Sequence, residues 1–249
     1  MDLPRHFTIR EGDLRIINPF APEKLATLGR VIKLSAGDTL VDLCSGKGEM
    51  LCTWARDHGI TGTGVDISTA NVAAARKRAA ALGVKVTFEH GDAAGYVAPA
   101  PADVAACIGA TWIGQGVEGT IGILERSLRP GGMMLIGEPY WRLDPPDQET
   151  VEACSAAEKE HFRSLPALVG QFGKLGWDVV EMVLSSQDDW DRYAAAHWLN
   201  IRRWLDANPG DPLWAQMRAE LDVDPVRHVK HQREYLGWGV FALIKRADH

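Results

Sequence analysis

The sequence predicts an α/β fold in which helices cover both faces of a mostly parallel β-sheet. Short apolar segments alternate with helical segments through the first 140 residues, a pattern typical of βαβ units. About 53 residues of helical character then separate the last two predicted strands. This segment is too long for a hairpin, so we expect a helical insertion before the last strand.

The expected strands are short apolar runs that end in turn residues. They lie at 39–44, 61–66, 84–89, 103–108, 132–137, 177–184 and 238–244. The expected helices lie at 22–33, 47–58, 69–82, 117–128 and 166–173. Strands of a parallel sheet are buried on both faces, which explains why these runs are apolar along their length.

The segment before the last strand carries its own helix signals. Ser186 and Asp189 fit a capping pair, and Asn208 begins an Asn-Pro-Gly stop. A second helix is expected from Asp211, with Pro212 at the favoured first position. Four of the nine tryptophans of the chain lie here, so we expect their rings to pack the insertion onto the sheet or to line a pocket.

Composition excludes several classes of protein. The chain has 249 residues, of which 46% are hydrophobic and 24% charged, as in ordinary globular proteins. The net charge of −6 gives no support for nucleic-acid binding. No signal peptide, membrane span or CxxC pair is evident, so we expect a cytoplasmic protein with free thiols and no membrane partner.

One stretch, Val41 to Leu51, carries the strongest chemical signal. A strand ends in an acid, Asp42, and a Gly-x-Gly turn made by Gly46 and Gly48 leads into a helix. Glycines allow a tight turn and close approach of a ligand, and the helix N-terminus presents free N–H groups to an anion.

Three further features stand after the next strands. Asp66 follows the second strand and is placed to accept from ribose hydroxyls. Asp92, within Gly-Asp-Ala, follows the third and is placed to accept from an adenine amino group. Small residues beginning at Gly109 follow the fourth strand. The carboxyl ends of parallel strands meet at one edge of an open sheet, where such sheets bind ligands.

These motifs resemble those of the class I S-adenosylmethionine-dependent methyltransferases. That family carries an acid-x-Gly-x-Gly-x-Gly signature, whose first glycine is Cys44 here, then an acid after strand two and Gly-Asp-Ala after strand three. The segments that begin at Asn18 (NPFxPEKLATLGR), Cys52 (CTWARDH) and Gly137 (GEPYWR) are similar to a group of bacterial methyltransferases of unassigned substrate.

The resemblance implies a Rossmann-like methyltransferase fold with a seven-stranded sheet. It also implies that S-adenosylmethionine is the cofactor and S-adenosylhomocysteine the product. The cofactor-binding residues implied by it are Asp42, Cys44, Gly46, Gly48, Asp66, Ile67, Asp92, Ala93 and Gly109.

Residues outside these motifs are candidates for chemistry on the acceptor. Glu138 follows the fifth strand, where a carboxylate can orient an amine or take a proton, although a buried structural acid is an equal reading. His197 lies on the insertion and is either catalytic or a core histidine. The expected substrate pocket contains Trp112, Tyr140, Tyr193 and Trp198. No metal site is expected.

The function expected from the sequence is in-line methyl transfer to a nitrogen, oxygen, sulfur or carbon atom of a small molecule. Two alternatives stay open, an RNA or protein methyltransferase and a catalytically silent cofactor-binding protein. The oligomeric state is left open. We expect an N-terminal leader and lid helix at 1–36, a cofactor-binding core at 37–140, and a loop, helix and sixth strand at 141–185. A helical lid is expected at 186–235, and the last strand and the C-terminus at 236–249.

Overall fold

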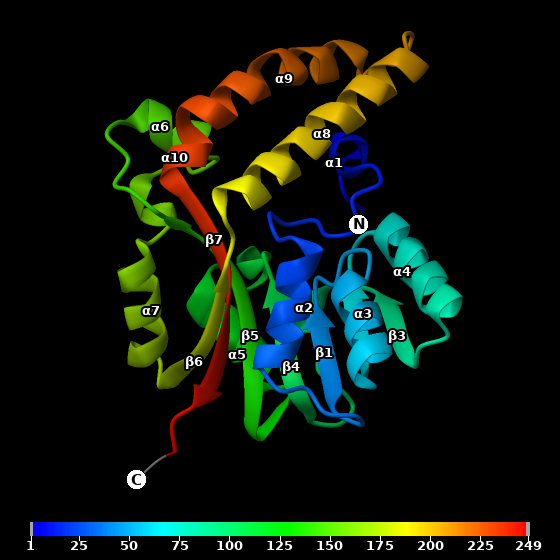
Figure 1. The fold of residues 1–249 in the computed structure, drawn as a ribbon, viewed down its shortest axis with the longest axis vertical. Helices are drawn as coiled ribbons and strands as arrows, with labels where there is room; N and C mark the ends of the chain where they lie inside the picture. Colours follow the sequence, from blue (N-terminus) through cyan, green and yellow to red (C-terminus); the bar gives the residue numbers. More distant parts are fainter. Residues whose placement is uncertain (1, 248–249) are drawn as a thin grey trace.

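The computed structural model describes residues 2–247, which form a seven-stranded sheet (Figure 1). The strand order is β3-β2-β1-β4-β5-β7-β6, and only β7 runs antiparallel to its neighbours. The strands are β1 (Thr39–Leu43), β2 (Thr61–Asp66), β3 (Val86–His90), β4 (Ala102–Ile108), β5 (Leu128–Trp141), β6 (Trp177–Leu184) and β7 (Leu236–Lys245). The prediction of a seven-stranded, mostly parallel sheet is confirmed.

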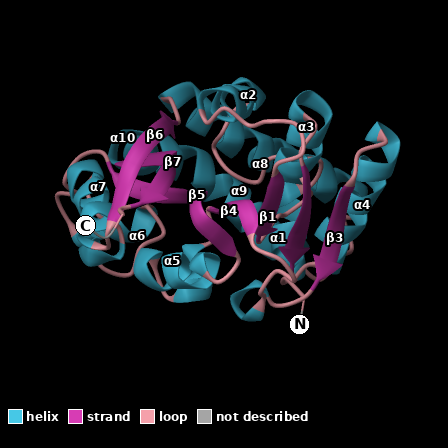
Figure 2. Cartoon of the chain, turned by 90° about the horizontal axis from the view of Figure 1, so that it is seen from below, coloured by secondary structure: helices cyan, strands magenta, loops and turns pink. Residues whose placement is uncertain are grey.

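Helices cover both faces of the sheet, as Figure 2 shows from below. One face carries α2 (Pro22–Val31), α3 (Glu49–His58) and α4 (Thr69–Leu82), and Leu28 and Trp54 are fully buried in its core. The other face carries α5 (Val117–Glu125) and α7 (Leu165–Lys174), with Leu124 and Phe172 in a second core. The sheet is thus buried on both sides, which accounts for its continuous apolar strands.

The strand β5 is longer than the predicted 132–137. Pro130, Gly131 and Pro139 are strand breakers in the sequence, yet β5 extends from Leu128 to Trp141. The antiparallel partner β7 pairs with β5 from Met133 to Trp141, and this tertiary pairing overrides the local signals. The extension places Glu138 inside the strand instead of after it.

The helical insertion lies across the carboxyl ends of the parallel strands (Figure 1). It consists of α8 (Gln187–Ala207), α9 (Trp214–Arg227), a π-helical turn η4 (His228–Gln232) and α10 (Arg233–Tyr235). The predicted capping box at Ser186 and Asp189 is present. The helix α8 follows the carboxyl end of β6, and α10 precedes the amino end of the antiparallel strand β7. Both connections therefore lie at the same end of the sheet.

Two short helices outside the insertion were not predicted from the sequence. The helix α1 (Arg5–Glu11) packs Ile9 against Ile201 and Leu205 of α8, and Asn200 donates hydrogen bonds to the carbonyls of Arg10 and Glu11. The other is α6 (Gln148–Ala153). Residues 12–21 connect α1 to α2 and are called the strap below.

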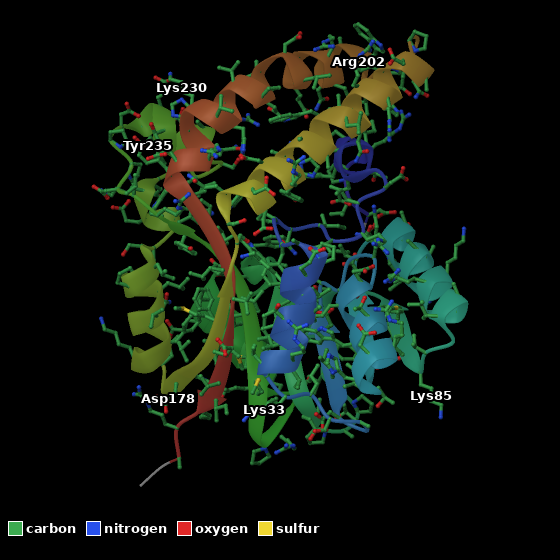
Figure 3. The ribbon with its side chains drawn as sticks, in the orientation of Figure 1. Lys33, Lys85, Asp178, Arg202, Lys230 and Tyr235 are labelled. Carbon is green, nitrogen blue, oxygen red and sulfur yellow. The ribbon has the colours of Figure 1, made fainter. Side chains whose placement is uncertain are left out.

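Charged side chains mark the two ends of the molecule. Figure 3 places Arg202 and Lys230 on the insertion, far from Lys33 and Lys85 at the opposite end. Arg202 pairs with Asp206, and Lys230 pairs with Glu149. Within residues 2–247, no helix combines the length and apolar character needed to span a bilayer.

Candidate functional site

The Gly-x-Gly loop between β1 and α3 is fixed by the acid that ends β2. Cys44 and Gly46 both adopt positive φ angles, of 62° and 53°. Asp66 accepts hydrogen bonds from the backbone N–H of Gly46 (2.8 Å) and of Ser68 (2.9 Å). The carboxylate has further lone pairs, so it can accept from a ligand while it holds the loop.

Gly48 has a packing role in this loop. It is the N-cap of α3 with φ of 70°, and a Cβ atom there would lie 2.5 Å from the Phe88 ring. Gly48 lies beneath the loop, against β3. It lines neither of the two cavities at this end of the sheet. A glycine is therefore needed here for helix–sheet packing, and Gly48 is the one residue of the nine expected to bind a cofactor that does not line a cavity with the others.

A cavity of about 410 Å³ opens at the carboxyl ends of β1 to β4, beneath the strap. We call it the loop-side cavity. It brings together the other eight residues expected to hold a cofactor: Asp42, Cys44, Gly46, Asp66, Ile67, Asp92, Ala93 and Gly109. Residues from four strand ends thus meet in one place, as the parallel topology requires.

Acidic groups dominate the electrostatics of the loop-side cavity. Burial, together with the negative charge of Asp66, raises the pKa of Asp42 well above its usual range. A cationic ligand group beside Asp42 would compensate its charge, so this position suits an ammonium. Asp92 accepts from the N–H of Ala94 through one oxygen, which leaves its second oxygen for a ligand amino group.

The strap and α1 add residues that sequence analysis missed. Glu11 and Asn18 line the loop-side cavity, and Lys47 donates a hydrogen bond to the carbonyl of Gly12 (2.6 Å). Burial raises the pKa of Glu11. No local motif marks Glu11, because α1 has no side-chain cap and is positioned by α8, and the segment that begins at Asn18 gave no role for that side chain.

A second cavity, of about 1060 Å³, lies between the sheet and the insertion. We call it the insertion-side cavity. Its walls come from the strap, the end of β5, α8, and the short 3₁₀ turn η2 (Thr111–Gly114). It brings together five of the residues expected to act on an acceptor: Trp112, Glu138, Tyr193, His197 and Trp198.

Glu138 is the acid in this cavity that is best suited to proton transfer. The hydroxyl of Thr111 donates a 2.7 Å hydrogen bond to its Oε2. Burial raises the pKa of Glu138 to about 7, and the Thr111 hydrogen bond opposes that shift. A carboxyl group with this pKa can take up or release a proton near neutral pH.

His197 lies on α8 and is buried, with its ring 4.4 Å from the Tyr193 ring. Burial lowers its pKa to about 4, and the positive charge of Arg10 acts in the same direction. The imidazole is therefore neutral at physiological pH. Within the described chain its Nε2 has no hydrogen-bond partner.

Tyr140 is the one expected pocket residue that lines neither cavity. It points to the face of β5 that also holds Met134 and Ile136, and is buried in the second core. Opposite it on β7 stands Gly237, where any Cβ atom would overlap the phenol ring. The missing side chain at Gly237 makes room for Tyr140 in the core, which corrects the sequence-based assignment.

Four residues line both cavities: Asn18, Gly109, Trp112 and Trp238. Trp112 is 73% exposed, an unusual state for a tryptophan. These four residues mark the place where the two cavities meet.

A family model described as "Methyltransferase domain" matches residues 40–132, the segment that builds most of the loop-side cavity. The Escherichia coli protein YjhP is 58% identical over 248 residues, which cover 99% of this chain and all of YjhP.

Solved structures agree with that relationship. A SAM-dependent methyltransferase from Geobacter sulfurreducens, in complex with S-adenosyl-L-homocysteine, is 59% identical with a TM-score of 0.97, covering 98% of this chain and 99% of that one. A SAM-dependent methyltransferase from Thiobacillus denitrificans, also with S-adenosyl-L-homocysteine, is 58% identical with a TM-score of 0.97, covering 99% and 100%.

Proposed function

This chain belongs to the family of S-adenosylmethionine-dependent methyltransferases, and from that premise we propose that it methylates a small molecule held in the insertion-side cavity. The observation that supports this proposal is the junction of two cavities at four shared residues. The loop-side cavity would hold the cofactor, and the volume of the insertion-side cavity is ample for a small acceptor.

The residues of the loop-side cavity fit the cofactor chemically. Asp42 offers a buried carboxyl group to an ammonium, Asp66 offers an acceptor to ribose hydroxyls, and Asp92 offers one to the adenine amino group. When bound, the cofactor supplies a methyl group on a sulfonium, which is already a good leaving group. The protein therefore has to position and desolvate the acceptor more than to activate the donor.

The proton from the acceptor would go to Glu138. Its pKa of about 7 leaves a substantial fraction ionised at neutral pH, and Thr111 holds one carboxylate oxygen in place. The other oxygen is available to an N–H or O–H group of the acceptor. His197 is neutral, and its ring beside Tyr193 would contribute to the wall that orients the acceptor.

The aromatic residues of the insertion-side cavity would exclude water from this reaction. Trp190, Tyr193 and Trp198 contribute from α8, and Trp112 and Trp238 contribute at the junction. Four of the nine tryptophans lie in the insertion, and two of those four, Trp190 and Trp198, line this cavity. A concave cavity with aromatic walls favours a small acceptor over a polymer.

Calorimetry and a small-molecule screen test this proposal. We expect one site per chain for S-adenosylmethionine and for S-adenosylhomocysteine, and formation of the demethylated cofactor with at least one member of a small-molecule library. Absence of binding of both cofactor forms, or turnover only with RNA or protein acceptors, would overturn it.

A further inference from the structure

Asn18 occupies a special place in the strap. It lines both cavities and therefore lies at the junction where, if the proposed function holds, the methyl group crosses from donor to acceptor. Asn18 begins one of the segments that resemble bacterial methyltransferases, but that resemblance assigns no role to its side chain. Its side chain reaches the junction from the N-terminal strap, whereas Gly109 and Trp112 reach it from the sheet.

Hydrogen bonds of its side chain and of the neighbouring backbone fix the orientation of Asn18. Its Nδ2 donates a 3.2 Å hydrogen bond to the carbonyl of Ile108, at the end of β4. The neighbouring carbonyls of the strap are also bound: Tyr193 donates its hydroxyl to Ile17, and Ser185 donates its hydroxyl to Pro19. Because the amide nitrogen is used in this way, the amide oxygen must point away from Ile108.

The amide oxygen of Asn18 lies directly over Gly109. A Cβ atom at Gly109 would overlap Oδ1, and Gly109 has φ of 77°, so only glycine fits beneath it. No donor within residues 2–247 makes a hydrogen bond to this oxygen. The junction thus contains a fixed carbonyl oxygen with free acceptor capacity.

We propose that Oδ1 of Asn18 recognises the methyl group of the bound cofactor. Carbon attached to a sulfonium bears polarised C–H bonds, and a carbonyl oxygen accepts such weak hydrogen bonds. No bond to Asn18 forms or breaks. Once the methyl group has moved, the remaining thioether has neither the methyl nor the positive charge, so this contact is lost. Asn18 therefore favours the loaded cofactor over the spent one and helps product to leave.

The test measures affinities for both cofactor forms, so it does not depend on knowing the acceptor. Dissociation constants for S-adenosylmethionine and S-adenosylhomocysteine are determined by calorimetry for the wild type and for Asn18→Ala. We expect Asn18→Ala to weaken the affinity for S-adenosylmethionine about two- to fivefold more than the affinity for S-adenosylhomocysteine. This factor corresponds to the loss of one C–H···O contact. Thermal unfolding verifies that the variant is folded.

Two further variants separate recognition from loosening of the strap. Ser185→Ala removes the hydrogen bond to the carbonyl of Pro19. We expect it to weaken the affinities for S-adenosylmethionine and S-adenosylhomocysteine by the same factor, so the ratio of the two dissociation constants stays unchanged. Asn18→Asp keeps an oxygen at the junction and adds a negative charge. We expect it to shift the ratio in favour of S-adenosylmethionine, because only that form is a sulfonium cation.

The ratio decides between the outcomes. If Asn18→Ala weakens both ligands equally, or if the ratio is the same in all variants, Asn18 has only a structural role and the proposal is wrong. If the wild type binds neither ligand, the proposed function itself fails, and this inference fails with it. A shift confined to the two Asn18 variants supports the proposal, whatever the acceptor is.

Discussion

The two cavities meet at shared residues, yet they are built in different ways. The loop-side cavity takes most of its polar groups from strand ends between Asp42 and Gly109, in the order in which the strands occur. The insertion-side cavity collects side chains from α1, η2, β5, α8 and α9, which are spread over nearly the whole chain. The polar groups of the loop-side cavity are thus close together in sequence, whereas the insertion-side cavity depends on tertiary packing.

This difference divides the chemistry as well. In the proposed function, acids whose spacing is set by sheet topology bind the cofactor. The proposed acceptor would contact aromatic rings together with Glu138 and His197, whose pKa values are shifted by burial. Variants on one side should leave the other side intact, and the following predictions test that separation.

Glu138→Gln should have the largest effect. We expect turnover to fall by roughly 10²- to 10⁴-fold, because a proton acceptor is lost, while the affinity for S-adenosylhomocysteine stays within about twofold. In the wild type, kcat/KM should decrease as pH falls below about 7, because protonated Glu138 cannot accept a proton. Steady-state kinetics across pH, with an acceptor found by the screen, measure both effects.

Thr111→Val is the matched control for this pH profile. The Thr111 hydrogen bond lowers the pKa of Glu138, so its removal should move the midpoint to higher pH without abolishing turnover. Wild-type turnover in Glu138→Gln would instead identify Glu138 as a buried structural acid.

The same carboxyl group should show its burial in protein stability. The folded state raises the pKa of Glu138 from 4.5 to about 7, so the native protein retains a proton that the unfolded chain releases. The wild type should therefore lose stability relative to Glu138→Gln as pH rises from about 4.5 through 7, by up to about 3 kcal/mol. Urea unfolding at pH 5 and at pH 8 measures the free energy of unfolding of both proteins. The same difference between wild type and Glu138→Gln at the two pH values would contradict this prediction.

Asp66→Ala should act on the cofactor side alone. It removes the acceptor for the N–H groups of Gly46 and Ser68 and for a ligand hydroxyl, so we expect affinity for S-adenosylhomocysteine to weaken by about 1–3 kcal/mol. Calorimetry measures this loss. Binding at wild-type strength would show that the loop keeps its shape without Asp66 and that the ligand does not use it.

Tyr140→Phe should have the smallest effect. The phenol ring lies in the core opposite Gly237, away from both cavities, so we expect KM for the acceptor to change by less than about twofold. Tyr193→Phe is the comparison, because Tyr193 lines the insertion-side cavity and bonds to the strap. A larger effect on KM from Tyr140 than from Tyr193 would contradict the placement of these residues.

Sequence analysis predicted the sheet and the loop-side cavity well, because both depend on local signals. Strand ends and their acids recur with βαβ spacing, so Asp42, Asp66 and Asp92 could be assigned to one edge of the sheet. Gly48 shows the limit of the motif, since a glycine needed for packing against Phe88 has the same spacing as one that lines a cavity.

The elements that were missed are those shaped by distant contacts. The helix α1 has seven residues and no side-chain cap, and its stability comes from Ile9 against α8. The real length of β5 depends on β7, which lies about a hundred residues later in the chain. Tyr140 was misplaced for the same reason, because its environment is decided by Gly237 on β7.

The position of β7 also constrains how this protein is made. β7 is the last strand in the sequence but lies between β5 and β6, and within residues 2–247 β6 pairs with no other strand. On the ribosome, the strands of the loop-side cavity can pair as they emerge, while β6 and the insertion must wait for the final residues. A nascent chain can thus pair β1 to β4, which carry the acids of the loop-side cavity, before β7 adds Trp238 to the walls of both cavities.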